Sequence, residues 1–129
     1  MCWFIKKTVE RPSPKIRITP EMADKVIRAI QFIPGYDLCY VAAVAPTNSM
    51  EPVIDDGMYV IIQLVNYHDL IVGDIIWYEH PEFKAIHRII KILNDGSWYC
   101  ICKGDNNSSK DPVRVRPEHI RGVWRMTLD

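Results

Sequence analysis

A serine in a short polar loop is the residue best placed to do chemistry in this chain. Ser49 lies in Pro-Thr-Asn-Ser-Met-Glu-Pro, residues 46–52, between two apolar segments that favour strands, 38–45 and 57–65. Asn48 tolerates left-handed backbone angles, so the loop can turn sharply and expose the serine hydroxyl. A serine is a poor nucleophile until a neighbouring base takes its proton. The remaining elements must therefore position a base beside this loop.

The candidate base is His87, in the segment 84–91, Lys-Ala-Ile-His-Arg-Ile-Ile-Lys. If this segment is a strand, His87 shares a face with Ala85 and Ile89, and Arg88 points the other way. A half-buried histidine of this kind can serve as a general base. A structural histidine in the core or at a sheet edge explains the same pattern, and taken alone it is the commoner case.

A third polar group is expected from the loop 103–111, Lys-Gly-Asp-Asn-Asn-Ser-Ser-Lys-Asp. Asp105 or Asp111, placed beside His87, would fix the tautomer of the ring and stabilise the imidazolium formed during attack. A solvated turn would have the same composition. A calcium loop fits less well, because acidic ligands at regular alternate positions are missing.

The first element that must support these loops is a helix. Thr19 is a typical N-cap, followed by proline and glutamate in the first turn. The helix is expected to end near Phe32, before Pro34-Gly35, and residues 1–18 are expected to be irregular or a short edge strand. Apolar residues at helical spacing predict one buried stripe: Met22, Val26, Ile30 and Ile33.

From residue 38 onward the pattern predicts strands bounded by turn residues. They are expected at 38–45, 57–65, 74–80, 84–93, 97–103 and 119–128. Asn94-Asp95-Gly96 predicts a hairpin, and the doubly apolar segment 57–65 predicts a central strand. The fold class is therefore mainly β, a coiled, mostly antiparallel sheet or partial barrel with one N-terminal helix. It forms one compact domain, with an arm and helix at 1–37 and the β domain at 38–129.

Composition narrows the possible partners. The chain has 129 residues with 16 basic and 16 acidic side chains, which argues against a nucleic-acid backbone binder. The longest uncharged run, 38–50, is far shorter than the ~18 residues of a membrane span. The N-terminus carries its charges after its apolar residues, the reverse of a secretion signal. A cytoplasmic, soluble chain without an integral membrane segment is expected, with a peripheral contact through Trp3 and Phe4 left open.

The four cysteines are expected to be free and buried, as in a reducing compartment. They are Cys2, Cys39, Cys100 and Cys102. The last two lie on one face of a predicted strand and are poorly placed to bridge each other. Zinc ligation with His80 or His119 is less favoured, because there is no CxxC pair. No metal and no cofactor are expected.

The order of the short motifs resembles that of the type I signal peptidases. These are Ser-Met-Glu-Pro at 49–52, Gly-Asp-Ile-Ile at 73–76, His-Arg-Ile at 87–89 and Lys-Gly-Asp-Asn-Asn at 103–107, with a trailing Asp111. The similarity is greatest to the endoplasmic-reticulum, archaeal and sporulation branch, which has histidine where most bacterial enzymes have lysine. It covers about residues 38–124 and implies the same coiled β-fold.

The resemblance also implies roles for particular residues. Ser49 would be the nucleophile, His87 the general base, Asp111 its acidic partner and Asp105 the aspartate that braces the site. The Ser49 amide and the Thr47 hydroxyl would form the oxyanion hole. The expected substrate-binding residues are Ala43, Ala45 and Met50. The family resemblance implies a preference for small side chains, and Ala42, Ala43 and Ala45 could line a shallow pocket for them.

Two departures from the family keep other functions open. The membrane anchor is absent, and Asn48 stands where glycine is usual. We therefore expect a soluble serine endopeptidase, of a kind that a phage or mobile element could encode, acting on a peptide or protein substrate. One alternative is a non-catalytic peptide-binding module on the same fold. Another is a self-cleaving regulator of the SOS-repressor type, although those proteins use lysine and cut an Ala-Gly or Cys-Gly pair that this chain lacks.

Overall fold

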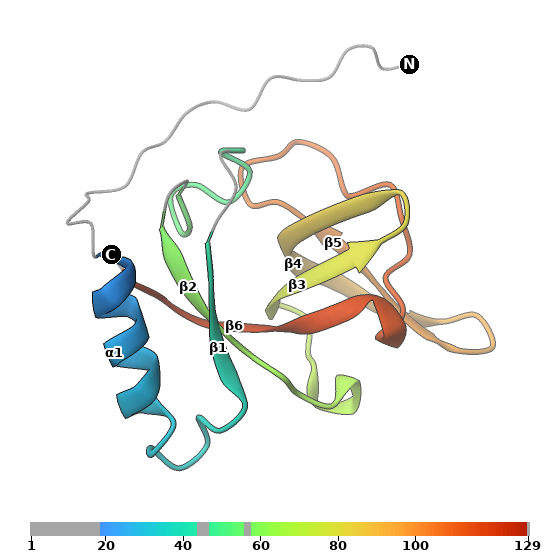
Figure 1. Ribbon diagram of the computed structural model, residues 1–129. Coiled ribbons are helices and arrows are strands. Elements are labelled where there is room, and N and C mark those ends of the chain that lie inside the picture. The colour runs from blue at the N-terminus through green and yellow to red at the C-terminus, as the bar shows by residue number, and fades with distance from the viewer. Residues whose placement is uncertain (1–18, 44–46, 56–57, 129) are drawn as a thin grey trace.

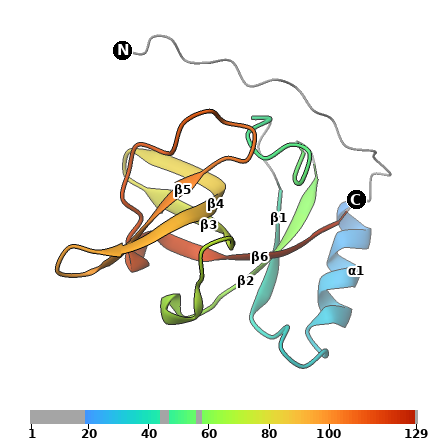
Figure 2. The same ribbon diagram turned by 180° about the vertical axis from the view of Figure 1, so that it is seen from behind.

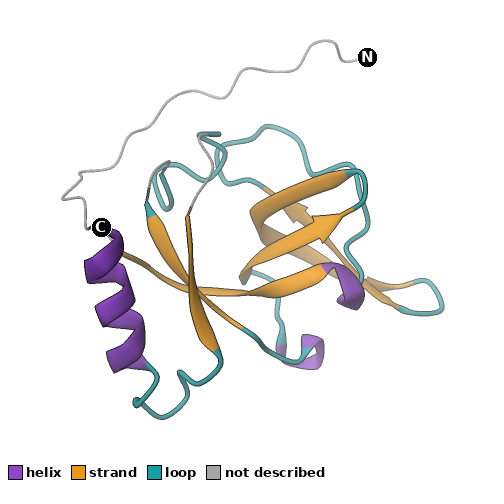
Figure 3. Cartoon of the chain, in the orientation of Figure 1, coloured by secondary structure: helices purple, strands orange, loops and turns teal. Residues whose placement is uncertain are grey.

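A computed structural model describes residues 19–43, 47–55 and 58–128, and every structural statement below concerns these residues. They form a mainly β structure with one α-helix (Figures 1 and 3). The expected N-terminal arm, 1–18, lies outside them. The strands are β1 (Cys39–Ala43), β2 (Tyr59–Gln63), β3 (Ile75–His80), β4 (Phe83–Asn94), β5 (Trp98–Lys103) and β6 (Ile120–Leu128). The helices are α1 (Pro20–Ile30) and two short 3₁₀ turns, η1 (Tyr67–Asp69) and η2 (Pro117–His119).

The six strands form one open sheet in the order β1-β2-β6-β3-β4-β5. Every neighbouring pair is antiparallel, which confirms the predicted fold class. β2 lies between β1 and β6, as its two apolar faces predict, and β4 and β5 form the predicted hairpin. β1 and β5 are the two edges. The strand ends lie within two residues of the predicted ones wherever both ends are described, and the last residues of β3, β5 and β6 are the predicted ones.

The last strand joins the two halves of the sheet. β6 pairs with β3 through its first residues and with β2 through the rest, so it crosses the molecule in both views (Figures 1 and 2). Gly122 lies at the crossing with a φ of 156°, and a Cβ there would lie 2.7 Å from the Gln63 carbonyl oxygen. Only glycine allows β6 to approach β2 this closely while it turns toward β3.

The apolar side chains form separate clusters on the two faces of this twisted sheet. The largest includes Ile76, Tyr78, Ile89, Cys100, Cys102, Val115 and Val123. A second includes Met50, Ile54, Val60, Ile62 and Ile75, and therefore packs beneath the loop that carries Ser49. A third joins α1 to the sheet through Ile27, Ile30, Cys39 and Ile61.

The predicted buried stripe of the helix is wrong except at Ile30, although the helix itself is present. The Thr19 hydroxyl accepts a hydrogen bond from the Met22 amide at 3.2 Å, as expected of an N-cap, and α1 ends at Ile30 rather than near Phe32. The buried residues are Ala23, Ile27 and Ile30, whereas Met22, Val26 and Ile33 are exposed. α1 packs beside the edge strand β1, so it buries only a narrow stripe, and the small Ala23 gives the closer approach.

Cys39, Cys100 and Cys102 are free and buried, and Cys2 lies outside the described residues. No helix in the described ranges is long and apolar enough to cross a membrane. Across the same ranges, no three histidine, cysteine, aspartate or glutamate side chains are grouped so that they could hold a metal ion.

Candidate active site

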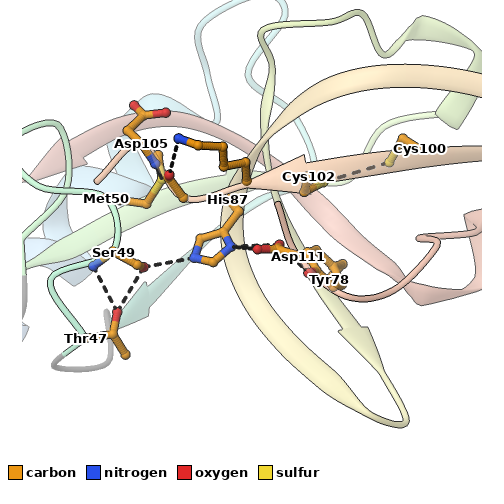
Figure 4. Close-up of polar contacts among 11 residues, drawn as sticks. Thr47, Ser49, Met50, Tyr78, His87, Cys100, Cys102, Asp105 and Asp111 are labelled. Atoms are coloured by element: carbon orange, nitrogen blue, oxygen red, sulfur yellow. Dashed lines mark hydrogen bonds and ion pairs between the residues drawn. The ribbon is translucent and has the colours of Figure 1, made fainter. Parts of the chain in front are cut away.

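Ser49 lies in the turn that follows β1, at the edge of the second apolar cluster. Asn48 has a φ of 61°, the left-handed conformation that asparagine tolerates better than most residues. This turn directs the Ser49 hydroxyl toward β4, where its Oγ lies 2.9 Å from His87 Nε2 (Figure 4). The Thr47 hydroxyl lies 3.1 Å from the same Oγ and 3.5 Å from the Ser49 amide nitrogen.

His87 is held on the inner face of β4 and is only 4% exposed. Its Nδ1 lies 2.8 and 2.7 Å from the two carboxylate oxygens of Asp111. Because an ionised carboxylate only accepts hydrogen bonds, Nδ1 carries the proton and donates it to Asp111. The lone pair of Nε2 then faces the Ser49 hydroxyl, which is the arrangement a general base requires.

Asp111 follows β5 and is 3% exposed. Its amide donates to the Cys102 carbonyl at 2.8 Å, which fixes the backbone of this irregular segment against the strand. The Tyr78 hydroxyl donates to Asp111 Oδ2 at 2.5 Å (Figure 4). Burial, followed by the hydrogen bond to Asp111, raises the pKa of the Tyr78 phenol well above its ordinary value, so this hydroxyl remains a donor. The buried carboxylate thus has a donor on each side.

Asp105 lies apart from the His87 ring and pairs with Arg88, the next residue of β4. Arg88 Nε and Nη2 donate to the two oxygens of Asp105 at 2.8 and 2.7 Å, a bidentate pair. Arg88 Nη1 also donates to the Gly73 carbonyl at 2.8 Å. The hydrogen bonds that Arg88 donates to Asp105 raise the pKa of the guanidinium. This pair ties the loop 103–111 to β4 and to the turn before β3.

The loop around Asp105 also holds the backbone of the serine turn. The Asn106 amide donates to the Ser49 carbonyl at 2.8 Å, and its side-chain Nδ2 donates to the Asn48 carbonyl at 3.0 Å. A Cβ at Gly104 would lie 2.7 Å from the Ser49 carbonyl oxygen. Glycine is therefore needed where the two loops meet. The Asp105 amide contacts the Met50 sulfur at 3.3 Å, which joins the loops at a third point.

A cavity of about 770 Å³ opens beside Ser49 and His87. Its walls come mainly from β1, residues 47–50 and the first half of β4, with Trp77 from β3, and they are mostly apolar. They include Tyr40, Ala42, Ala43, Trp77 and Ile86. Ala43 and Met50 line it as expected, although Met50 is buried and also packs in the core, while Ala45 lies outside the described residues.

The structure brings together the three residue types that the motifs singled out. Ser49, His87 and Asp111 form one chain of contacts, and Asp105 stands on the other face of β4 with Arg88. Sequence reasoning missed Tyr78 and the side chain of Asn106. Asn106 lay within a noted motif, so it could have been considered. Tyr78 carries no motif signal, because its contact depends on the register of β3 with β4.

A pair of buried, free cysteines lies near this site. Cys100 and Cys102 Sγ are 4.0 Å apart on the same face of β5. The neighbouring Cys100 thiol and then burial raise the pKa of Cys102 far above its ordinary value.

No protein-family model matches this chain, and no curated protein matches it significantly.

Proposed function

We propose that this chain is a serine endopeptidase similar to the type I signal peptidases that use histidine as base. The observation that carries the proposal is the buried chain of contacts from Ser49 Oγ through His87 to Asp111. Three such groups in this order are what acyl transfer by a serine requires. A structural role would explain a buried histidine and aspartate, but it would not require a serine hydroxyl facing the free ring nitrogen at the wall of a cavity.

In the first half of the proposed reaction, Ser49 Oγ attacks the carbonyl carbon of the scissile peptide bond. His87 Nε2 takes the hydroxyl proton, and the Asp111 carboxylate stabilises the imidazolium that results. Charge develops on the carbonyl oxygen. We propose the Ser49 amide and the Thr47 hydroxyl as its donors, as the family resemblance implies, and the Thr47 hydroxyl lies 3.1 Å from Ser49 Oγ. Loss of one oxyanion donor typically costs a factor on the order of 100 to 1000 in kcat.

In the second half, His87 gives its proton to the nitrogen of the leaving amine as the carbon–nitrogen bond breaks. The acyl group then remains on Ser49. A water molecule gives a proton to the same Nε2 and attacks the ester, and Ser49 recovers its proton when the acid product leaves. Nε2 thus serves both halves, which its position between the serine hydroxyl and the cavity allows.

The cavity suits an extended peptide. β1 is an edge strand, and residues 83–87 of β4 lie before the point at which β5 begins to pair, so both strands have a free side among the described residues. An extended segment can add to such edges through main-chain hydrogen bonds. Ala42 and Ala43 leave room for the peptide beside Ser49, and the apolar walls favour apolar side chains. We propose peptides with a small residue before the scissile bond as the substrate class.

The decisive experiment compares the purified chain with two serine variants. Wild type, Ser49→Ala and Ser109→Ala are incubated with a library of extended peptides, and the products are measured by mass spectrometry. Ser109 is exposed on the loop 103–111, so its change is a matched control. We expect Ser49→Ala to lower the cleavage rate by more than about 1000-fold. Ser109→Ala should cleave as wild type does.

Peptide binding, measured by fluorescence polarisation, should survive in Ser49→Ala, because only a hydroxyl is removed. Equal cleavage by wild type and Ser49→Ala would contradict the proposal. Binding by wild type with no cleavage of any peptide would favour the non-catalytic module. A fall in the mass of the chain itself, at a rate independent of its concentration, would favour self-cleavage within one chain.

A further inference from the structure

Tyr78 is a fully buried tyrosine in the middle of β3. In the register of β3 with β4, Tyr78 lies opposite Ala85, and Ile76 lies opposite His87. Tyr78 and His87 are therefore diagonal neighbours on the same face of the sheet, a distance that an aromatic side chain can span. The hydroxyl of Tyr78 reaches Asp111 Oδ2, so Asp111 lies between the tyrosine and the histidine (Figure 4).

The surroundings of Tyr78 hold its ring in place. Phe83 stacks on it with ring centroids 6.3 Å apart, and the same phenylalanine lies 6.1 Å from the His87 ring. Ala85, the residue opposite Tyr78, adds only a methyl group on this face, which leaves space for the larger ring. The hydroxyl is therefore delivered to Asp111 by a side chain with little freedom to move.

The carboxylate of Asp111 needs this second donor. A charged group that is almost fully buried is costly unless hydrogen bonds satisfy its oxygens. The Nδ1–H of His87 lies between the two oxygens, at 2.8 and 2.7 Å, and by itself does not select one of them. The Tyr78 hydroxyl bonds only Oδ2, at 2.5 Å, and so fixes the rotation of the carboxylate about its own axis.

We infer that Tyr78 is a positioning residue that orients Asp111 and, through it, the His87 ring toward Ser49. The inference depends on the proposed peptidase function for its effect on rate, but its structural part concerns only the contacts of Asp111. Tyr78 touches neither Ser49 nor the cavity. The Tyr78 hydroxyl draws part of the negative charge of the Asp111 carboxylate away from His87, and it keeps the carboxylate in one orientation.

The test compares Tyr78→Phe with Tyr99→Phe, each in the full chain. Tyr99 is also a buried strand tyrosine. Its ring lies 4.7 Å from the guanidinium carbon of Arg114, whereas the phenolic hydroxyl that donates to Asp111 belongs to Tyr78. The first readout is the low-field proton resonance of His87 Nδ1–H in NMR, assigned by its loss in His87→Gln. Without the tyrosine donor, the carboxylate holds the Nδ1 proton more strongly. We expect the resonance to move downfield in Tyr78→Phe and to stay in place in Tyr99→Phe.

Strengthening the phenol as a donor, instead of removing it, provides a second probe, and it keeps a tyrosine side chain at position 78. Replacement of all six tyrosines by 3-fluorotyrosine makes each phenol a stronger donor. The same proton resonance should then move upfield. This measurement also decides the matter if Tyr78→Phe fails to fold. An unchanged resonance in 3-fluorotyrosine protein, or in folded Tyr78→Phe, would overturn the inference.

The kinetic readout uses the peptide that wild type cleaves fastest. Loss of a hydrogen bond to a charged group corresponds to a fall of about tenfold to a hundredfold in kcat, and KM should be unchanged. Without the Tyr78 hydroxyl, the Asp111 carboxylate directs more of its negative charge at His87. The acid limb of the kcat/KM profile should therefore shift to higher pH. A fall in rate without that shift, and with no change of the resonance, would indicate mere loss of packing and contradict the inference. If wild type cleaves nothing, the peptidase proposal fails, and the resonance still decides the role of Tyr78.

Discussion

His87 and Arg88 are consecutive residues of β4 that face opposite sides of the sheet, and each pairs with an aspartate of the same loop. His87 is buried and bonds Asp111, which Tyr78 bonds as well. Arg88 is about one-third exposed and makes a bidentate pair with Asp105. One side of the strand therefore carries a network shielded from water, and the other carries an ion pair that water reaches.

The buried side and the outer side of β4 are therefore suited to different tasks. On the buried side, each polar group has a specific partner, and the low dielectric makes each hydrogen bond stronger. That side is suited to moving a proton. On the outer side, the Arg88–Asp105 pair connects loops, since Arg88 also reaches the Gly73 carbonyl and the residue after Asp105 holds the Ser49 backbone. The outer side is suited to aligning these loops, and other contacts between the loops contribute to the same alignment.

The largest expected effect contrasts the two aspartates directly. Asp111→Asn should lower kcat by about 10⁴-fold, because an amide does not hold the ring in the tautomer that accepts the serine proton. Asp105→Asn should lower kcat by on the order of 10-fold to 100-fold through a small displacement of the serine turn. The measurement is single-turnover cleavage of the peptide that wild type cleaves fastest.

Thermal unfolding of both variants shows whether each one remains folded under the assay conditions. Equal losses of rate in two folded variants would break the distinction between the two sides of β4. A larger loss in Asp105→Asn would assign the main role to the outer pair.

Much of the candidate site could be predicted from residue types because its members lie in short motifs. A polar turn between apolar segments indicates Ser49, and a histidine among apolar strand residues indicates His87. The strands themselves follow from β-branched residues and turn signals. Asp111 and Asp105 could not be told apart by local pattern. The resemblance assigned them different positions, and the geometry pairs each with a different residue of β4.

The features that could not be predicted depend on contacts between distant segments. Tyr78 reaches Asp111 across 33 residues of sequence, because β3 pairs with β4 in one particular register. The buried stripe of α1 was wrong for a similar reason. Two apolar stripes are available on that helix, and the choice between them depends on how the helix lies against the edge of the sheet.

A smaller effect tests two neighbouring residues of α1, one buried and one exposed. Ile27 is 8% exposed and packs against Cys39 and Ile61, whereas Val26 is 37% exposed. Ile27→Ala should lower the free energy of unfolding by about 2–3 kcal/mol, since it leaves a gap between α1 and β1. Val26→Ala should change it by less than about 0.5 kcal/mol. Urea unfolding measures both, and a larger loss in Val26→Ala would restore the stripe that the sequence predicted.

The smallest expected effect concerns a third aspartate, which pairs with two arginines at the surface of the molecule. Asp95, at the tip of the β4–β5 hairpin, accepts hydrogen bonds from Arg116 at 2.7 and 3.1 Å and from Arg114 at 2.6 Å. The hydrogen bonds from Arg116, supported by those from Arg114, hold the pKa of Asp95 well below its usual range. A carboxylate whose pKa is lowered in the folded state adds stability above its unfolded pKa, about 3.9. That contribution is lost as the pH falls from about 4 through the folded value.

Asp95→Asn should therefore lower the melting temperature slightly at pH 7 and make it less dependent on pH below about 4. Water screens this pair, so the change at neutral pH should be the smallest of those proposed. The matched control is Asp69→Asn, an exposed aspartate in η1 with no ion pair in the described part of the chain. Melting curves between pH 3 and pH 7 measure the effect, over a range set by the ordinary pKa of aspartate. A pH dependence in Asp95→Asn as steep as that of wild type would show that acid sensitivity arises elsewhere, and the buried Asp111 would be the next carboxylate to test.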